Sequence, residues 1–196
     1  MFPERTVAHA LLDEAEFLHP GDWVPHVKLV ARAAESIAAK LGLDPEKAYV
    51  LGLLHDIGRR FGKFNLIHGF HGYQYLTELG FPAAARVCLT HSFITRRIDD
   101  TGGHWDGTEQ ERITAQTLLD SFEWDEYDRL ILFCDSITMG DGYHLLEQRL
   151  MEVALRRGIF PNAPEKWRLY IQLKDYFSQQ LGYPVYQALL EPLIIQ

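Results

Sequence analysis

Apolar residues recur every three or four positions along most of this chain, a spacing that places them on one face of a helix. No segment alternates apolar and polar residues over the length that a half-buried strand would need. Stretches rich in glycine, proline and acidic residues separate the periodic segments. Helices are therefore predicted over residues 4–18, 25–42, 44–58, 71–78, 82–91, 110–120, 125–138, 141–157, 164–181 and 184–194.

Particular residues indicate where these predicted helices begin and where they pack closely. Asp44 stands where an N-cap is expected, and Pro45 at the first helical position, where proline is tolerated. Gly52 lies within a helix, where glycine costs about 1 kcal/mol relative to alanine, so close packing against a neighbour is expected there. Residues 98–109, rich in glycine and acid, form the one long predicted loop. The pattern predicts an all-α helical bundle that forms a single domain over residues 1–196.

Composition narrows the classes of partner. A length of 196 residues suits one domain with a sizeable core. The formal net charge of −8 argues against a nucleic-acid polymer as partner, but leaves room for a small nucleotide in a local basic pocket. Cys88 and Cys134 lie in apolar runs and are predicted to be buried free thiols. The absence of a long apolar run and of signal-peptide features predicts a cytoplasmic protein without a membrane partner.

Histidine and aspartate residues with the chemistry of metal ligands lie on or beside the predicted helices. A His-Asp pair ends one helix in the context Leu-Leu-His-Asp-Ile-Gly, and an aspartate lies inside the apolar run 130–138. That buried carboxylate needs a partner, either a metal ion or hydrogen bonds to helix termini. If these side chains converge, they could hold one or two transition-metal ions, which generate hydroxide from bound water near neutral pH. The predicted ligands are His26, His55, Asp56, His68, His91 and Asp135.

The other histidines carry weaker signals. His9, His19 and His144 are interpreted as surface or helix-end residues, and His104 as a solvated residue of the acidic loop. His71 is ambiguous, because it follows a predicted ligand by three positions and could lie near the site.

The order of the six residues resembles that of the HD-domain metallohydrolases, which are named for their His-Asp pair. The superfamily order of His, His-Asp and Asp is matched at 26, 55–56 and 135, and the two histidines that binuclear members add are matched at 68 and 91. Segment 68–76 is similar to a helix start of the family in which histidine precedes glycine by four positions, which selects His68 with Gly72. The resemblance covers about residues 22–140, and helices in 141–196 have no identified counterpart.

This resemblance implies a hydrolase that cleaves a phosphoester or phosphoanhydride bond. Two metal ions would clamp the phosphoryl oxygens, with Asp56 as the bridging carboxylate and a metal-bound hydroxide as the nucleophile. Iron or manganese is expected, with nickel, cobalt or zinc as alternatives. Four imidazoles argue against magnesium or calcium alone.

Within the superfamily the chain resembles small bacterial HD phosphohydrolases, including those that cleave diadenosine tetraphosphate. Those proteins carry basic residues after the His-Asp pair and after the later histidine, so the expected substrate is a small phosphorylated metabolite, preferably a nucleotide. Arginine suits two-pronged phosphate contacts, although each candidate could equally belong to a solvated helix surface. The substrate-binding candidates are Arg59, Arg60, Lys63, His71, Arg96 and Arg97. The leaving-group acid stays open between a metal-bound water, His71 and a lysine.

Two other functions are compatible with parts of this pattern. Some HD-fold proteins hold a di-iron pair and use oxygen to cleave a carbon bond, and the same six ligands would serve that reaction. A non-catalytic HD signalling module is the least favoured alternative, because such modules generally lose ligands and this chain retains all six.

Overall fold

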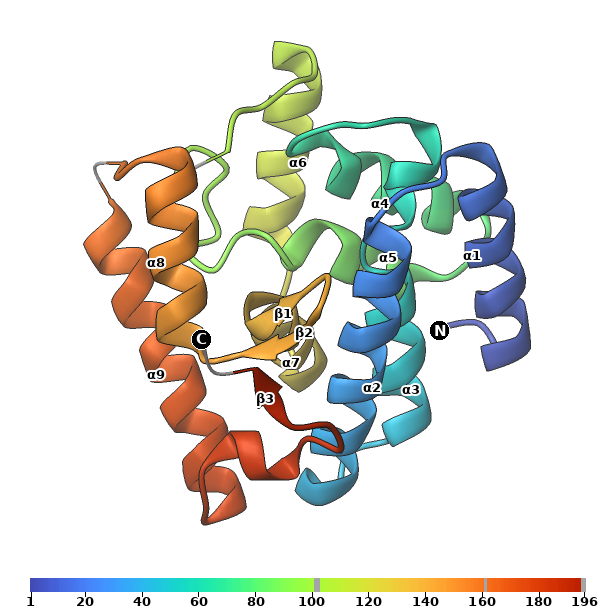
Figure 1. Cartoon of the computed structure of the whole chain (residues 1–196). Helices are drawn as coiled ribbons and strands as arrows, with labels where there is room; N and C mark the ends of the chain where they lie inside the picture. Colours follow the sequence, from blue (N-terminus) through green and yellow to red (C-terminus); the bar gives the residue numbers. More distant parts are fainter. Residues whose placement is uncertain (101–102, 161, 195–196) are drawn as a thin grey trace.

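The computed structural model describes residues 1–100, 103–160 and 162–194. The described residues are mostly helical, with a very small sheet, so the predicted all-α class is confirmed (Figure 1). The α-helices are α1 (Arg5–Leu18), α2 (Trp23–Leu41), α3 (Pro45–Leu54), α4 (Ile67–Glu78), α5 (Pro82–Thr90), α6 (Glu109–Ser121), α7 (Glu126–Ile137), α8 (Leu146–Arg157) and α9 (Ala163–Leu181). The shorter elements are the 3-10 helices η1 (Ile57–Phe61) and η2 (Val185–Ala188) and the strands β1 (Thr138–Met139), β2 (Gly142–His144) and β3 (Leu193–Ile194).

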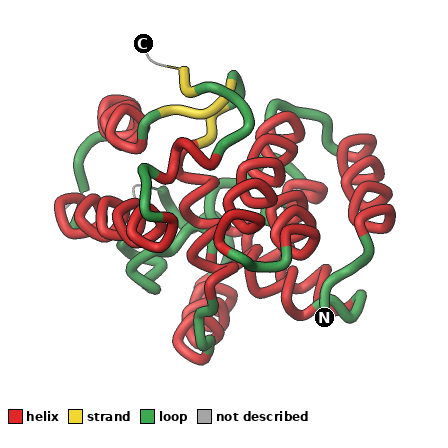
Figure 2. The backbone as a smooth tube through the Cα atoms, turned by 90° about the horizontal axis from the view of Figure 1, so that it is seen from below, coloured by secondary structure: helices red, strands yellow, loops and turns green. Residues whose placement is uncertain are grey.

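Helix α7 passes through the centre of the molecule. It contacts α2, α3 and α5 as well as α8 and α9, and its residues Leu130–Cys134 are each at most 1% exposed. The two views place α8 and α9 at one end of the molecule and α1 at the opposite end (Figures 1 and 2). A carboxylate on α7 can therefore face both the N-terminal helices and the C-terminal ones.

Helices α2 and α3 pack against each other at close range. A Cβ atom at Gly52 would lie 2.9 Å from Cα of Ala31, so the predicted close packing at this glycine is confirmed. The predicted N-cap is also confirmed, because the Asp44 carboxylate accepts hydrogen bonds from the backbone N–H groups of Glu46 and Lys47. These contacts fix the direction in which α3 approaches its last residue, Leu54.

A second apolar cluster fastens α4 and α5 to α6. It includes Ile67, Phe70, Leu89 and Leu119. The turn after α3 meets α4 so closely that a Cβ atom at Gly58 would lie 1.9 Å from the carbonyl oxygen of His68. Only a glycine allows this approach, which brings the His-Asp segment beside the start of α4.

Two predicted helix positions are wrong in detail. The segment predicted as helix from 141 begins instead with β2, which pairs antiparallel with β1 and parallel with β3. Gly142 has a φ of 148°, outside the helical region, and the Tyr143 hydroxyl donates to the carbonyl oxygen of Leu29 at 2.8 Å. The predicted helix 184–194 forms only η2 and β3, because Pro192 lacks the N–H that a continuing helix needs.

Other predictions are met within the described ranges. Both cysteines are free and buried. Segment 98–109 lacks helix up to Thr108, although Thr101 and Gly102 of that loop lie outside the described residues. None of the described helices has the length and apolar character needed to cross a membrane.

Candidate metal centre

The six predicted ligands come from five separate segments and meet in one place. His26 lies in the first turns of α2, the His-Asp pair joins α3 to η1, and His68 lies in the first turn of α4. His91 caps the C-terminal end of α5, and Asp135 lies near the end of α7. Helices α3, α5 and α7 thus contribute their C-terminal ends, and α2 and α4 their N-terminal ends.

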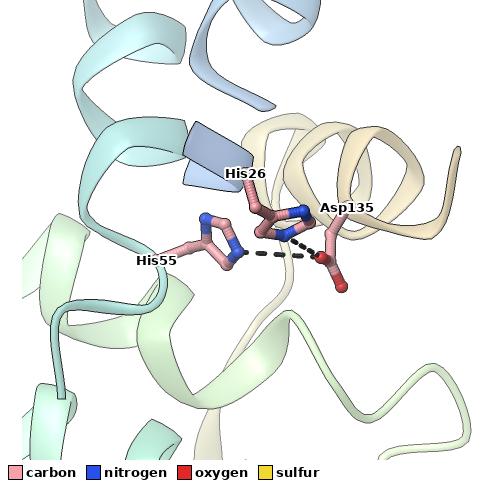
Figure 3. A group of neighbouring side chains, drawn as sticks. All are labelled: His26, His55 and Asp135. Atoms are coloured by element: carbon pink, nitrogen blue, oxygen red, sulfur yellow. Dashed lines mark hydrogen bonds and ion pairs between the residues drawn. The ribbon is translucent and has the colours of Figure 1, made fainter. Parts of the chain in front are cut away.

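One half of the cluster is formed around Asp135. Its Oδ1 atom lies 2.9 Å from Nε2 of His26 and 3.7 Å from Nε2 of His55, and both rings point toward the carboxylate (Figure 3). The other half is formed around Asp56, whose Oδ1 atom lies 2.8 Å from Nε2 of His68 and 3.5 Å from Nε2 of His91. His55 belongs to both halves, since it groups with His26 and Asp135 and also with Asp56 and His91.

Backbone carbonyl groups set the orientation of three of the rings. The Nδ1–H group of His55 donates to the carbonyl oxygen of Gly52 at 2.7 Å, and that of His91 to Val87 at 3.3 Å. His68 likewise donates from Nδ1 to the carbonyl oxygen of Asn65. With the proton held on Nδ1, each Nε2 atom keeps its lone pair and directs it into the cluster, as a metal ligand requires.

Two buried polar atoms of the cluster, Nε2 of His55 and Oδ1 of Asp56, form no hydrogen bond with any described residue. Buried polar atoms are rarely left in this state, so the position calls for a partner with positive charge. A divalent transition metal accepts imidazole nitrogen and carboxylate oxygen together, which matches this donor set. The residues present therefore fit a bound metal ion.

Electrostatics keeps the carboxylates ionised. Burial alone would raise the pKa of Asp56, but the charge of Arg59 first of all, together with the neighbouring imidazoles, outweighs it and holds that pKa well below its ordinary value. The pKa of Asp135 is likewise held low, against the effect of burial, by its hydrogen bond with His26 and by the electrostatic effect of His55, whose Nε2 atom lies 3.7 Å away. Burial and the neighbouring His55 lower the pKa of His91 to about 3, so this ring is neutral, the form that binds metals.

Except for His55, the predicted ligands border an open cleft of about 640 Å³. This volume lies within the roughly 300–1,000 Å³ that is typical of small-molecule sites. Arg59 lines the cleft, and its Nε–H donates to Oδ2 of Asp56 at 2.6 Å. The neutral side chains of Asn65 and Ser92 also line it. The cleft can therefore receive a small anion beside the predicted ligands.

The other basic candidates lie elsewhere. Lys63 is exposed and lies outside the cleft lining, and the Arg97 side chain is 71% exposed and pairs with Asp100. Arg96, which has a φ of 60°, stacks its guanidinium over the Trp124 ring. Nearness to His91 along the chain therefore does not carry over into space, because the turns after α5 lead the backbone away.

Two further candidates are occupied by structural contacts. His71 packs edge-on against the rings of Phe61 and Phe64, at centroid distances of 5.8 and 5.0 Å. Arg60 is buried, paired with Glu14, and stacked over Tyr75. Neither residue is part of the cleft lining.

The remaining histidines mostly follow their sequence interpretation. His104 hydrogen-bonds with the Asn65 side-chain amide at an exposed position, and the His9 ring contacts the Tyr49 hydroxyl. His144 differs from the prediction of a surface or helix-end residue. It is 4% exposed, because β2 carries it under the C-terminal segment, where it pairs with Asp141.

Sequence reasoning missed three cleft residues, all on α8: Arg149, Arg156 and Arg157. The adjacent pair of arginines in an acidic chain was an available signal. That this pair lies close to the predicted ligands depends on how α8 packs against α7, which no local sequence pattern predicts.

Comparison with known proteins identifies the family. The profile of the HD domain family matches residues 24–130, which is 107 of the 196 residues. A structural match is the HD domain of L. monocytogenes phosphodiesterase PgpH, with 17% identity, 86% of this chain and 99% of that chain covered, and a TM-score of 0.47. The same domain in complex with cyclic-di-AMP matches with 17% identity, coverage of 86% and 98%, and a TM-score of 0.44. A search of curated proteins finds no match. By its sequence profile, the chain belongs to the HD domain family.

Proposed function

We propose that this protein is a metal-dependent phosphohydrolase that cleaves a phosphoester or phosphoanhydride bond of a small phosphorylated metabolite, with a nucleotide as the favoured substrate. One observation carries the proposal: backbone-anchored imidazoles and two ionised carboxylates converge beside an arginine-lined cleft. Family membership supports metal-dependent hydrolysis. The basic cleft supports an anionic substrate.

In this proposal the six predicted ligands hold two divalent ions. Bound divalent ions polarise a phosphoryl oxygen and lower the pKa of a coordinated water. Asp56 would be shared between the two positions, because its Oδ1 atom faces His68 and His91 and the residue also groups with His55, while Arg59 pairs with Oδ2. His26, His55 and Asp135 complete the second position.

The cleft side chains bind and orient the substrate. Arg59 already pairs with Asp56, so it fixes that carboxylate and adds positive charge beside the phosphoryl group. Ser92 and Asn65 supply neutral hydrogen-bond donors along the same cleft. The leaving-group acid is not assigned to any side chain.

The test starts with metal content and phosphate release. We expect purified protein to retain transition metal and to release phosphate from at least one phosphorylated metabolite when supplied with manganese or iron. Asp56→Ala should abolish both metal retention and hydrolysis while circular dichroism shows a largely unchanged helical content. Asp13→Ala, at an exposed position on α1, is the matched control and should behave like the wild type.

Three outcomes contradict the proposal. Hydrolysis by Asp56→Ala within a few fold of wild type would show that this carboxylate is structural. Oxygen consumption with a non-phosphorylated substrate, without phosphate release from any ester, would favour the di-iron oxygenase. A protein that retains no metal and shows neither activity would favour a non-catalytic module.

A further inference from the structure

A second cavity, of about 200 Å³, lies between α8, α9 and the predicted metal ligands. The two spaces adjoin at a predicted ligand and along α8, because they share the lining residues Leu66, Ser92, Asp135, Arg149, Arg156 and Arg157. Its volume is below the roughly 300–1,000 Å³ of sites that enclose a whole small molecule. It therefore suits one part of a substrate whose reacting part lies in the cleft.

The charge of this second cavity is strongly positive. The only acidic residue in its described lining is Asp135, which is also a predicted metal ligand. The chain as a whole carries a net charge of −8, so a local excess of cations is not a consequence of composition. The basic residues of the lining are Arg149, Arg156, Arg157 and Lys166.

The positive charges of these residues are not equally neutralised by acidic partners. Arg149 and Arg156 both pair with Glu152 on the same helix. The Arg157 side chain forms no hydrogen bond or ion pair within the ranges that the structure describes. Arg157 is an exposed residue, and partial burial together with repulsion from Arg156 and Arg149 lowers its pKa.

Lys166 extends the same cluster from α9. Burial and the charge of Arg157 lower its pKa to about 8, although Asp100 and Asp135 oppose the shift. Its ammonium lies 5.7 Å from the Phe160 ring centroid and 5.9 Å from that of Tyr170. Like charges held together beside apolar rings repel each other more strongly than in water, and an anionic ligand would relieve that repulsion.

We propose that Arg157 and Lys166 bind a second phosphoryl group of the substrate, one that is not cleaved. The substrate class is then a small molecule with at least two phosphoryl groups, such as a nucleoside diphosphate. This inference rests on the proposed function, because the bound molecule is a substrate only if the protein hydrolyses it. The binding site itself is defined by these two cations and the cavity between α8 and α9.

The first experiment measures anion binding without catalysis. Inorganic pyrophosphate is titrated by calorimetry into the full-length protein after metal removal, so that only the side chains provide affinity. We expect saturable binding by the wild type and about tenfold weaker binding by Arg157→Gln and by Lys166→Gln, because each variant loses a charged hydrogen bond. Arg168→Gln, at an exposed position on α9 outside the cavity, is the matched control and should bind like the wild type.

The second experiment uses metal-loaded protein with the mono- and diphosphate of one nucleoside. We expect Lys166→Gln, whose lysine lines the second cavity and not the cleft, to raise KM for the diphosphate about tenfold and to leave KM for the monophosphate within about twofold. Absence of pyrophosphate binding, or equal binding by wild type and Arg157→Gln, would overturn the second site. If neither nucleotide is hydrolysed while pyrophosphate binding still depends on Arg157 and Lys166, the proposed reaction fails and the anion site stands.

Discussion

Helices α7 and α8 have the same length and meet at the cleft, but they are built differently. Of their 12 residues each, α7 buries seven and α8 buries one. Asp135 is thus held by a helix that is surrounded on all sides, whereas Arg157 lies on a helix that exposes Met151 and Leu155 to solvent. The comparison indicates that core packing sets the geometry of the predicted ligands. The positive charge that faces them comes from α8 and α9, which form a less tightly packed surface layer.

The largest effect in this comparison is expected at Asp128, a fully buried residue of α7. Its carboxylate accepts hydrogen bonds from Thr90 at 2.9 Å and from Nε of Arg86 at 3.0 Å, which ties α7 to the end of α5 beside His91. Asp128→Ala should lower the free energy of unfolding by about 3–5 kcal/mol, because it breaks a buried network in which this carboxylate pairs with the half-buried Arg86 and accepts from the buried Thr90 hydroxyl. Urea denaturation measures this change.

The matched control for that change is Asp175→Ala, at an exposed position on α9. It should alter the free energy of unfolding by about 0.5 kcal/mol or less. Similar decreases in the free energy of unfolding for the two variants would show that the core and the surface layer of α8 and α9 do not differ as described.

The next effect is expected at Gly58, where the His-Asp segment meets α4. A methyl group there would lie 1.9 Å from the carbonyl oxygen of His68 and 2.6 Å from the backbone nitrogen of Gly72. Gly58→Ala should cost about 3 kcal/mol of stability, near the upper end of overpacking effects, and weaken metal binding by displacing His68. Thermal unfolding and metal titration report the two changes separately.

Gly140→Ala provides the control, because a methyl group at this position would meet nothing within 4 Å. A Gly58→Ala protein with wild-type stability and metal affinity would show that the segment can shift without moving the ligands.

The smallest effect is expected in the pH dependence of pyrophosphate binding by Lys166, in the surface layer of α8 and α9. The pKa of Lys166 is lowered to about 8 by burial and by the charge of Arg157. The protonated amine is the form that attracts an anion, so its contribution to pyrophosphate binding should fall as pH rises through about 8. Lys166→Gln should lack this component.

Calorimetry on metal-free wild type and Lys166→Gln between about pH 7 and about pH 9 measures the difference, in which titration of pyrophosphate itself cancels. If the affinity for pyrophosphate depends on pH identically in the two proteins, Lys166 is not part of the anion site.

The sequence predicted the ligand cluster because metal chemistry restricts the residue types that can serve. An apolar helix containing Asp135 and a His-Asp pair at a helix end are visible without a structure. Helix periodicity likewise predicted the segments that surround them. Both signals are local, and both describe the well-packed part of the molecule.

The surface layer was harder to predict because its role depends on tertiary placement. Arg96 was expected at the site because it follows His91 closely, yet the chain turns and places it over Trp124. Arg157 lies far from every ligand in the sequence and reaches the cleft through the fold of α8. The start of α8 was also misplaced, since the hydrogen bond from Tyr143 to Leu29 joins segments more than 100 residues apart.

The carbonyl anchors of the histidines have a consequence for how this centre tolerates sequence drift. A helix leaves its last carbonyl groups without helical partners, and the His55 ring uses one of them, that of Gly52. The His91 ring shares the Val87 carbonyl with the His91 backbone N–H group. Every amino acid carries the same acceptor, so exchanging the side chain of Val87 or Asn65 preserves the ring orientation as long as the backbone path is kept. Most substitutions of the neighbouring residues should therefore leave the orientation of these rings unchanged. The predicted centre can be retained while the sequence around it diverges.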